Sequence, residues 1–160
     1  MSQTSYSLRL TEALAGMLAA PVEDCTIESY SNAAALPAGV FVTRDAADSA
    51  CKVPTSSAEV TASGIGFVMR NLAQEPVSDG GSTDVAALKG ASVVTRGKIW
   101  VLTESACAFG GDVFVRFTVE APDLQLGMPR NDADTDKAVA APGWKFRTTL
   151  GAAGLAIVER

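Results

Sequence analysis

The chain has no histidine among its 160 residues. That absence excludes catalytic Ser-His-Asp and Cys-His arrangements and removes the commonest side-chain ligand for transition metals. No apolar run approaches the roughly 18 to 20 residues that a membrane-spanning helix needs, so we expect a soluble protein with no membrane partner. The net charge is −5. We therefore expect no nucleic acid partner, because such affinity depends on clustered Lys and Arg.

Cysteines and aromatic residues are also scarce. Cys25, Cys51 and Cys107 are odd in number and widely spaced, with no Cys-x-x-Cys pair. This pattern indicates neither a disulfide framework nor a structural zinc site, and we expect buried, reduced thiols. Aromatic residues make up 6% of the chain, so each large ring contributes a large share of the apolar area that a core or an interface buries.

Carboxylates remain as candidates for chemistry. Glu23 with Asp24, Asp45 with Asp48, and the acids at 132–136 could each pair for acid–base work. Such a pair needs a cleft and two opposed environments, and the sequence predicts neither. We favour solvated loops and expect no catalytic residue, so we do not expect an enzyme.

A calcium loop is a second possibility for the last of these acidic segments. Asp132, Asp134 and Asp136 resemble its opening, where alternate carboxylates converge on one cation. Lys137 stands where the EF-hand turn requires Gly, and Gly143 stands where a bidentate Glu would close the site. We therefore expect no bound metal and no cofactor.

The chain does have the composition of a folded domain, with 48% hydrophobic and 19% charged residues. Leu8, Leu10, Leu14, Met17 and Leu18 form a partial helical stripe before Pro21, which predicts one N-terminal helix over 8–20. We expect an N-terminal arm and helix over 1–25 and a β-rich domain over 26–160.

Short segments rich in Val, Ile, Phe and Thr, separated by Gly, Pro, Asp and Ser, predict a mainly β domain after that helix. Many short strands with Gly-rich turns favour a β-sandwich or a closed barrel over an open sheet. Two polar connections, 74–84 and 122–142, are predicted loops. The predicted strands are 26–30, 39–43, 64–70, 92–95, 98–103, 113–120, 145–150 and 155–159.

Three large aromatic residues on these strands are candidates for an interface. Trp100 and Trp144 are the two largest side chains in the chain, and core packing is the favoured interpretation for both. Phe114 faces away from Val113 and Val115 if its strand is regular. If both faces of that sheet are apolar, another subunit would cover one of them, so we consider Trp100, Phe114 and Trp144 as interface residues.

The order of several short motifs is familiar. GIGFV at 64–68 is followed by VTRGKIWV at 94–101 and then by GDVFVR at 111–116, with PGWKFR at 142–147 and GLAIV at 154–158. In this order the chain resembles the phage structural cement proteins, also called capsid decoration proteins. Each motif alone is explained by turn chemistry and strand alternation, so the resemblance depends on their order and spacing.

The resemblance implies a β-sandwich or jelly-roll-like single domain that carries out no chemistry. It implies a homodimer or homotrimer that binds the major capsid protein on the outer surface of the virion and assembles in the host cytoplasm. It carries over no active-site residue. The alternatives are a carbohydrate- or small-ligand-binding β-domain, since the same folds host such sites, and a hydrolase with a carboxylate pair.

The cysteine pattern leads to a first prediction. Cys25, Cys51 and Cys107 should form no disulfide within the chain, as expected for a protein assembled in the reducing cytoplasm. Mass spectrometry of the intact protein under non-reducing conditions, with and without a thiol-alkylating reagent, should count three free thiols. A reproducible internal crosslink would indicate a secreted protein instead.

Overall fold

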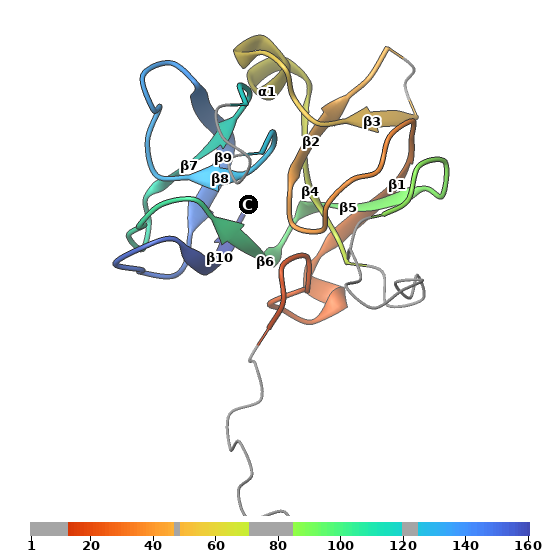
Figure 1. Ribbon diagram of the computed structural model, residues 1–160. Coiled ribbons are helices and arrows are strands. Elements are labelled where there is room, and N and C mark those ends of the chain that lie inside the picture. Colours follow the sequence, from red (N-terminus) through yellow and green to blue (C-terminus); the bar gives the residue numbers. More distant parts are fainter. Residues whose placement is uncertain (1–12, 47–48, 71–84, 120–124) are drawn as a thin grey trace, which may run out of the picture.

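The computed structural model describes residues 13–46, 49–70, 85–119 and 125–160, and it shows two groups of strands side by side (Figure 1). The mainly β class is confirmed, and the chain forms a single small domain. The short helix α1, Ser57–Ser63, packs at one end of the boundary, where it contacts both groups.

The first group is a closed five-stranded barrel. The first and third strands pair in parallel, and the other pairs are antiparallel. The barrel closes because the fifth strand pairs back onto the first. In spatial order its strands are β1 (Thr26–Asn32), β3 (Ala50–Lys52), β2 (Phe41–Arg44), β4 (Gly64–Val68) and β5 (Ala91–Arg96).

The second group is an antiparallel five-stranded sheet. In spatial order its strands are β6 (Lys98–Thr103), β10 (Gly154–Glu159), β9 (Ala138–Phe146), β7 (Asp112–Arg116) and β8 (Pro129–Arg130). Its two outer strands come close to each other, since the Glu104 N–H donates to the Pro129 carbonyl at 3.0 Å. The molecule is therefore a barrel beside a nearly closed sheet, an arrangement different from a jelly roll.

One residue links the two groups along the chain. Gly97 lies between β5 and β6 with a φ of 119°, and a Cβ at this position would stand 2.5 Å from the Cys25 sulfur. Only glycine fits such a conformation next to such a neighbour. The chain therefore passes from the barrel into the sheet in a single residue.

The main hydrophobic core lies between the barrel and the sheet. Phe41 of β2 and Phe67 of β4 belong to the same buried cluster as Trp144 of β9. The ring centroids of Phe41 and Phe67 are 5.2 Å apart, and those of Phe67 and Trp144 are 4.9 Å apart, both edge to face. A second cluster, which includes Val42 and Val93, fills the barrel. Aromatic packing thus connects the two groups of strands.

The prediction of one N-terminal helix over 8–20 is wrong for the part that the structure describes, 13–20. Gly16 adopts a φ of 84°, which a helix does not allow. Its N–H donates to the Trp100 carbonyl at 2.7 Å, and the Met17 carbonyl accepts from the Trp100 N–H at 2.8 Å. The segment pairs with the edge of β6, because that edge offers its backbone groups partners outside a helix. Residues 8–12 lie outside the described residues.

Helix α1 was not predicted, although its start is visible in the sequence. The Ser56 hydroxyl accepts from the Glu59 N–H at 3.4 Å, and the Glu59 carboxylate accepts from the Thr55 N–H at 2.7 Å. Ser-x-x-Glu before an apolar residue is the signature of a helix N-terminus. Val60 is the apolar residue, and it is completely buried in the main core. The helix is only seven residues long, too short for an apolar period to show.

Six predicted strands are confirmed to within a few residues, as β1, β2, β4, β5, β6 and β10. The strand predicted over 113–120 ends at Arg116, so that Val119 is exposed. The predicted loop 122–142 is wrong where it contains β8 and the first half of β9. The predicted loop 74–84 lies in the undescribed range 71–84.

The strand predicted over 145–150 is instead β9, which begins seven residues earlier and contains Pro142 and Gly143. These two residues lie at a bulge. Between the pairs Asp112↔Lys145 and Phe114↔Ala140, β7 advances by two residues (114 − 112) and β9 by five (145 − 140). Proline and glycine are accepted inside a strand at such an irregularity, which is why they did not end it.

Burial affects two of the three cysteine thiols. Cys51 and Cys107 are buried, and desolvation by burial raises the pKa of the Cys51 thiol to about 11. This thiol is therefore protonated and poorly nucleophilic at neutral pH.

Among the described residues no helix is long and apolar enough to cross a membrane.

The aromatic contact between barrel and sheet leads to a second prediction. Phe67→Ala should lower the free energy of unfolding by about 3–5 kcal/mol, because it opens a cavity in the core. Phe109→Ala is the matched control, since Phe109 is 65% exposed and its ring centroid lies 5.5 Å from the guanidinium carbon of Arg147. It should cost less than about 1 kcal/mol. Urea unfolding followed by tryptophan fluorescence measures both, and equal losses would contradict the role of Phe67.

Candidate functional site

The three predicted interface residues do not form one surface. Trp144 is 0% exposed and packs on Phe67, which supports core packing for this residue. Trp100 on β6 and Phe114 on β7 are half-buried, and β10 and β9 separate their strands in the sheet. An interface role for Trp100 and Phe114 stays a prediction.

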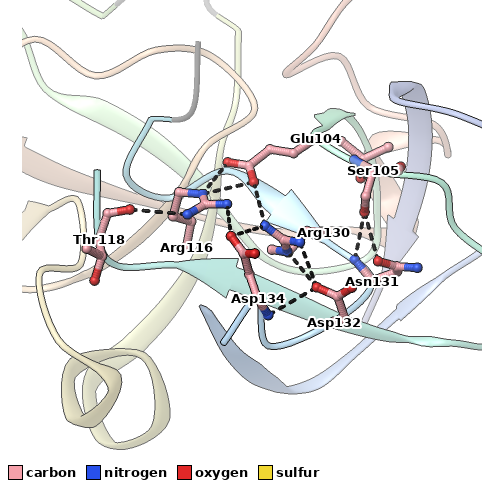
Figure 2. A network of polar contacts seen from close by, with 9 residues as sticks. Glu104, Ser105, Arg116, Thr118, Arg130, Asn131, Asp132 and Asp134 are labelled. Carbon is pink, nitrogen blue, oxygen red and sulfur yellow. Dashed lines mark hydrogen bonds and ion pairs between the residues drawn. The ribbon is translucent and has the colours of Figure 1, made fainter. Parts of the chain in front are cut away.

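A network of ion pairs joins the ends of three strands of the sheet (Figure 2). Glu104 follows β6, Arg116 ends β7 and Arg130 ends β8. The Arg116 Nε donates to both oxygens of Glu104, at 2.8 and 2.9 Å, and Arg130 Nη1 lies 3.3 Å from the same carboxylate. The side chains of Glu104 and Arg116 are at most 2% exposed, so this pair is desolvated.

Two aspartates complete the network. Asp134 Oδ2 accepts from Arg116 Nη2 at 2.5 Å and lies 2.6 Å from Arg130 Nη1, while Asp132 accepts from Arg130 Nε at 2.9 Å. The hydrogen bond from Arg116 is the main cause that lowers the pKa of Asp134 below its ordinary value. Its contribution to stability is therefore present above that ordinary value and is lost as the pH falls through the lowered one.

These aspartates are the ones that resemble a calcium loop. In the structure Asp132 and Asp134 pair with guanidinium groups, Asp134 half-buried and Asp132 at the surface, so both carboxylates already have a cationic partner within the protein. In the described part of the chain no three Cys, Asp or Glu side chains gather as metal ligands would. What the network does is structural: Glu104 and Arg130 hold β6 and β8 together at the place where the sheet nearly closes.

The other acidic pairs are also dispersed. Glu23 and Asp24 are exposed on the short 3-10 helix Val22–Asp24. Asp45 lies 3.9 Å from the Lys52 ammonium, and Asp48 lies outside the described residues. Within the described ranges, none of these carboxylates lines the cleft described next.

An apolar cleft of about 370 Å³ opens between the barrel, β6 and the N-terminal segment. Its walls are Ala15, residues 37–40, Leu102, Gln125 and Met128. Leu102 is 50% exposed, and two further large apolar side chains, Leu14 and Met17, are 44% and 37% exposed on the adjoining segment. We call this cleft the β6 groove.

The backbone of β6 is open at the groove. On its outer side, the Lys98 carbonyl accepts from the Ala19 N–H and both backbone groups of Trp100 pair with residues 16 and 17. Leu102 is the next residue facing that side, two positions further along the strand. There the chain has turned away at Gly16, and among the described residues no main-chain group pairs with Leu102 on that side. The next outward position, Glu104, donates its N–H to the Pro129 carbonyl, so the edge is open only at Leu102, and the groove combines this one open position with apolar walls.

Sequence reasoning missed these residues. Leu14 and Met17 were assigned to a helical stripe, and Leu102 was taken as an ordinary strand position. Strand alternation could have identified Leu102, because Ile99 and Val101 form the buried face and leave Leu102 on the opposite one. No sequence signal showed that residues 37–40, the segment that leads into β2, would supply the other wall.

The same fold occurs in a protein of known structure. It matches a chain in a solved structure described as the capsid of Myoviridae phage XM1, with a TM-score of 0.71 and 17% sequence identity over 98% of this chain and 97% of that one. No curated protein matches the sequence. Over residues 2–160 the chain matches the family described as structural cement protein (E217 gp24/Pam3 gp6), and it belongs to that family.

The buried ion pair leads to a third prediction. Glu104→Gln should lower the free energy of unfolding by about 3–5 kcal/mol, because it leaves the completely buried Arg116 without its main counter-charge. The control is Asp112→Asn, which removes the partner of Lys145 at an exposed ion pair and should cost about 0–1 kcal/mol. Chemical denaturation measures the free energy of unfolding of both variants. A Glu104→Gln protein as stable as the wild type would show that the network does not hold the sheet closed.

Proposed function

We propose that this protein is a cement protein that binds the outer surface of a phage head and stabilises contacts between major capsid protein subunits. The observation that carries the proposal is the family match over residues 2–160, supported by a fold that also occurs in a phage capsid. The proposal includes assembly in the host cytoplasm and a division of the chain into an arm, 1–25, and a body, 26–160.

Self-association is part of the proposal. Icosahedral shells present two-fold and three-fold symmetric sites, and a homodimer or homotrimer can contact several capsid subunits at once. Each contact can then be weak, because attachment at one site raises the effective concentration of the next. Exposed apolar side chains, such as Leu102 and Phe109, provide area for such contacts.

The alternatives have less support. The β6 groove has the volume of a small-ligand site, but among the described residues Gln125 is the one polar side chain on its walls, whereas sugar recognition needs several directed hydrogen-bond groups. A hydrolase with a carboxylate pair would need two carboxyl groups in one cleft, and in the part of the chain that the structure describes no carboxylate lines this groove. A nucleic acid partner is disfavoured by the net charge of −5 and by the engagement of Arg116 and Arg130 with carboxylates.

Reconstitution of heads gives a fourth prediction. Heads prepared without this protein should bind it when it is added back and should then melt at a higher temperature, since a ligand of the assembled shell shifts the equilibrium toward assembly. Sedimentation measures binding and calorimetry measures melting. Heads emptied of DNA should behave in the same way.

Two controls limit the interpretation of that experiment. Heads that already carry the protein should bind little more and should show no further rise in melting temperature. A glycan array tests the main alternative in parallel. A protein that neither sediments with the heads nor changes their melting, and that binds a specific sugar, would overturn the proposal.

A further inference from the structure

Four charged side chains form a row across the outer face of the sheet. The register pairs Lys98 of β6 with Glu159 of β10, and Glu159 in turn with Lys145 of β9. Lys145 pairs with Asp112 of β7. Each of the four has a chain neighbour that is 0% exposed, namely Ile99, Val158, Phe146 and Val113. Since successive side chains of a strand point to opposite faces, the four charges point outward, and we call them the charge row.

The signs alternate along the charge row, and its two central residues have hydrogen-bonding capacity left. The Lys145 ammonium donates to Asp112 Oδ1 at 2.6 Å, and two of its three N–H donors remain. Glu159 accepts from Arg147 through Oε2, and among the described residues its other carboxylate oxygen has no partner. The side chains of Lys145 and Glu159 are 43% and 29% exposed. Both are therefore available to a second molecule.

We infer that a second copy of the chain docks on this face, about a two-fold axis that runs along the strands between β10 and β9. Such an axis reverses the charge row, so that Glu159 of each copy faces Lys145 of the other. Lys98 and Asp112 come opposite each other at the two ends. An axis across the strands would place each charge opposite its own copy, so the signs select the first arrangement. The inference deepens the proposed self-association and rests on it.

Charge balance explains why a second copy fits this face. The net charge is −5, so two copies of the chain repel each other at long range. The charge row holds two positive and two negative side chains, in an order that is complementary to itself. Two copies that meet at this face therefore exchange a general repulsion for pairs of opposite charge.

Apolar area lies directly beside the charge row. Two residues further along β6, Trp100 pairs with Ile157 of β10 and faces the same side. Beyond them Leu102 pairs with Leu155, and Leu102 is 50% exposed. Trp100, Ile157 and Leu155 are half-buried within one chain, so each has area left to bury. The charges fix the register of the two copies, and these side chains add buried apolar area.

The curvature of the sheet places the closest contact at its middle. Its outer strands β6 and β8 nearly meet, so the outer face is convex. Two convex faces come closest at their centres, where β10 and β9 lie. Sheets packed face to face are about 10 Å apart, a gap that a glutamate and a lysine can span together. The pairs of Glu159 with Lys145 are therefore the main charged contacts, and the ends of the row contribute less.

Charge reversal in two separate variants tests the inference. Glu159→Lys sets two ammonium groups opposite each other in the dimer, and Lys145→Glu sets two carboxylates opposite each other. Each variant alone should dimerise about tenfold more weakly or worse, because two like-charged contacts replace two opposite ones. Glu159→Gln, which only removes the charge, should weaken dimerisation by a smaller factor. Sedimentation velocity over a range of concentrations measures the dissociation constants.

A mixture of the two reversed variants gives the sharpest measurement. In a dimer with one chain of each kind, both central contacts again join opposite charges. The mixture should therefore dimerise about as tightly as the wild type, and native mass spectrometry should find the mixed dimer in excess over either homodimer. Mixing does not change the like-charged neighbours inside each chain. If the charge row acts only within one chain, mixing should bring no recovery, and that result would overturn the inference.

Lys52→Glu is the matched control for a change of net charge. Lys52 also belongs to a partly exposed ion pair, 2.7 Å from Glu59, but it lies on β3 of the barrel. This variant should leave dimerisation unchanged. Equal weakening by Lys52→Glu and Lys145→Glu would show a general effect of charge and would contradict a specific contact at the row. Urea unfolding checks that every variant remains folded.

The results separate this inference from the proposed function. A wild-type trimer, or a dimer that neither reversal weakens, would overturn the inference and leave self-association intact. A wild-type protein that is monomeric at all concentrations would overturn both of these. Binding to heads is measured independently in the reconstitution experiment, so its failure would contradict the cement function without any bearing on the two-fold contact.

Discussion

The contact of the Phe67 ring with Phe41 on one side and Trp144 on the other is the interaction on which the rest of the structure depends. A five-stranded barrel of short strands encloses only a small core, and a single sheet encloses none. Packed together through these rings, the two share one core. The Trp144 Nε1 atom is buried and has no hydrogen-bond partner in the described part of the chain, a cost that the packing of its ring must outweigh.

The ion-pair network solves a different problem. A sheet whose outer strands do not pair leaves backbone groups and core side chains open to water. At the narrow gap between β6 and β8, one backbone hydrogen bond and the Glu104 carboxylate bridge the two edges. A carboxylate and a guanidinium at such depth are costly to desolvate, and they persist because each guanidinium nitrogen of Arg116 donates to an acceptor, on Glu104, Thr118 or Asp134. The acidic loop at 132–134 is thus part of the framework of the sheet.

Much of the fold was predictable from the sequence, and the reasons for the failures are local. Short runs rich in β-branched and other apolar residues between turn residues identified β6 and β10, because each of these strands has one face in the core. The N-terminal helix failed because spacings of three and four residues among Leu14, Met17 and Leu18 also arise in an irregular segment whose partner, β6, is far away in sequence. Pro142 and Gly143 concealed most of β9. The groove could not be predicted, since its walls come from four separate segments.

Helix α1, the Phe67 contact and the turn at Gly97 all lie on the boundary between barrel and sheet, and α1 and the β5–β6 connection stand at opposite ends of it (Figure 1). Two bodies joined at one end can move about a hinge, and two bodies joined only by a flexible linker can also rotate relative to each other. Attachment at both ends and in the middle removes these degrees of freedom. A force applied to the barrel is therefore transmitted to the sheet, because there is no hinge between them that could bend.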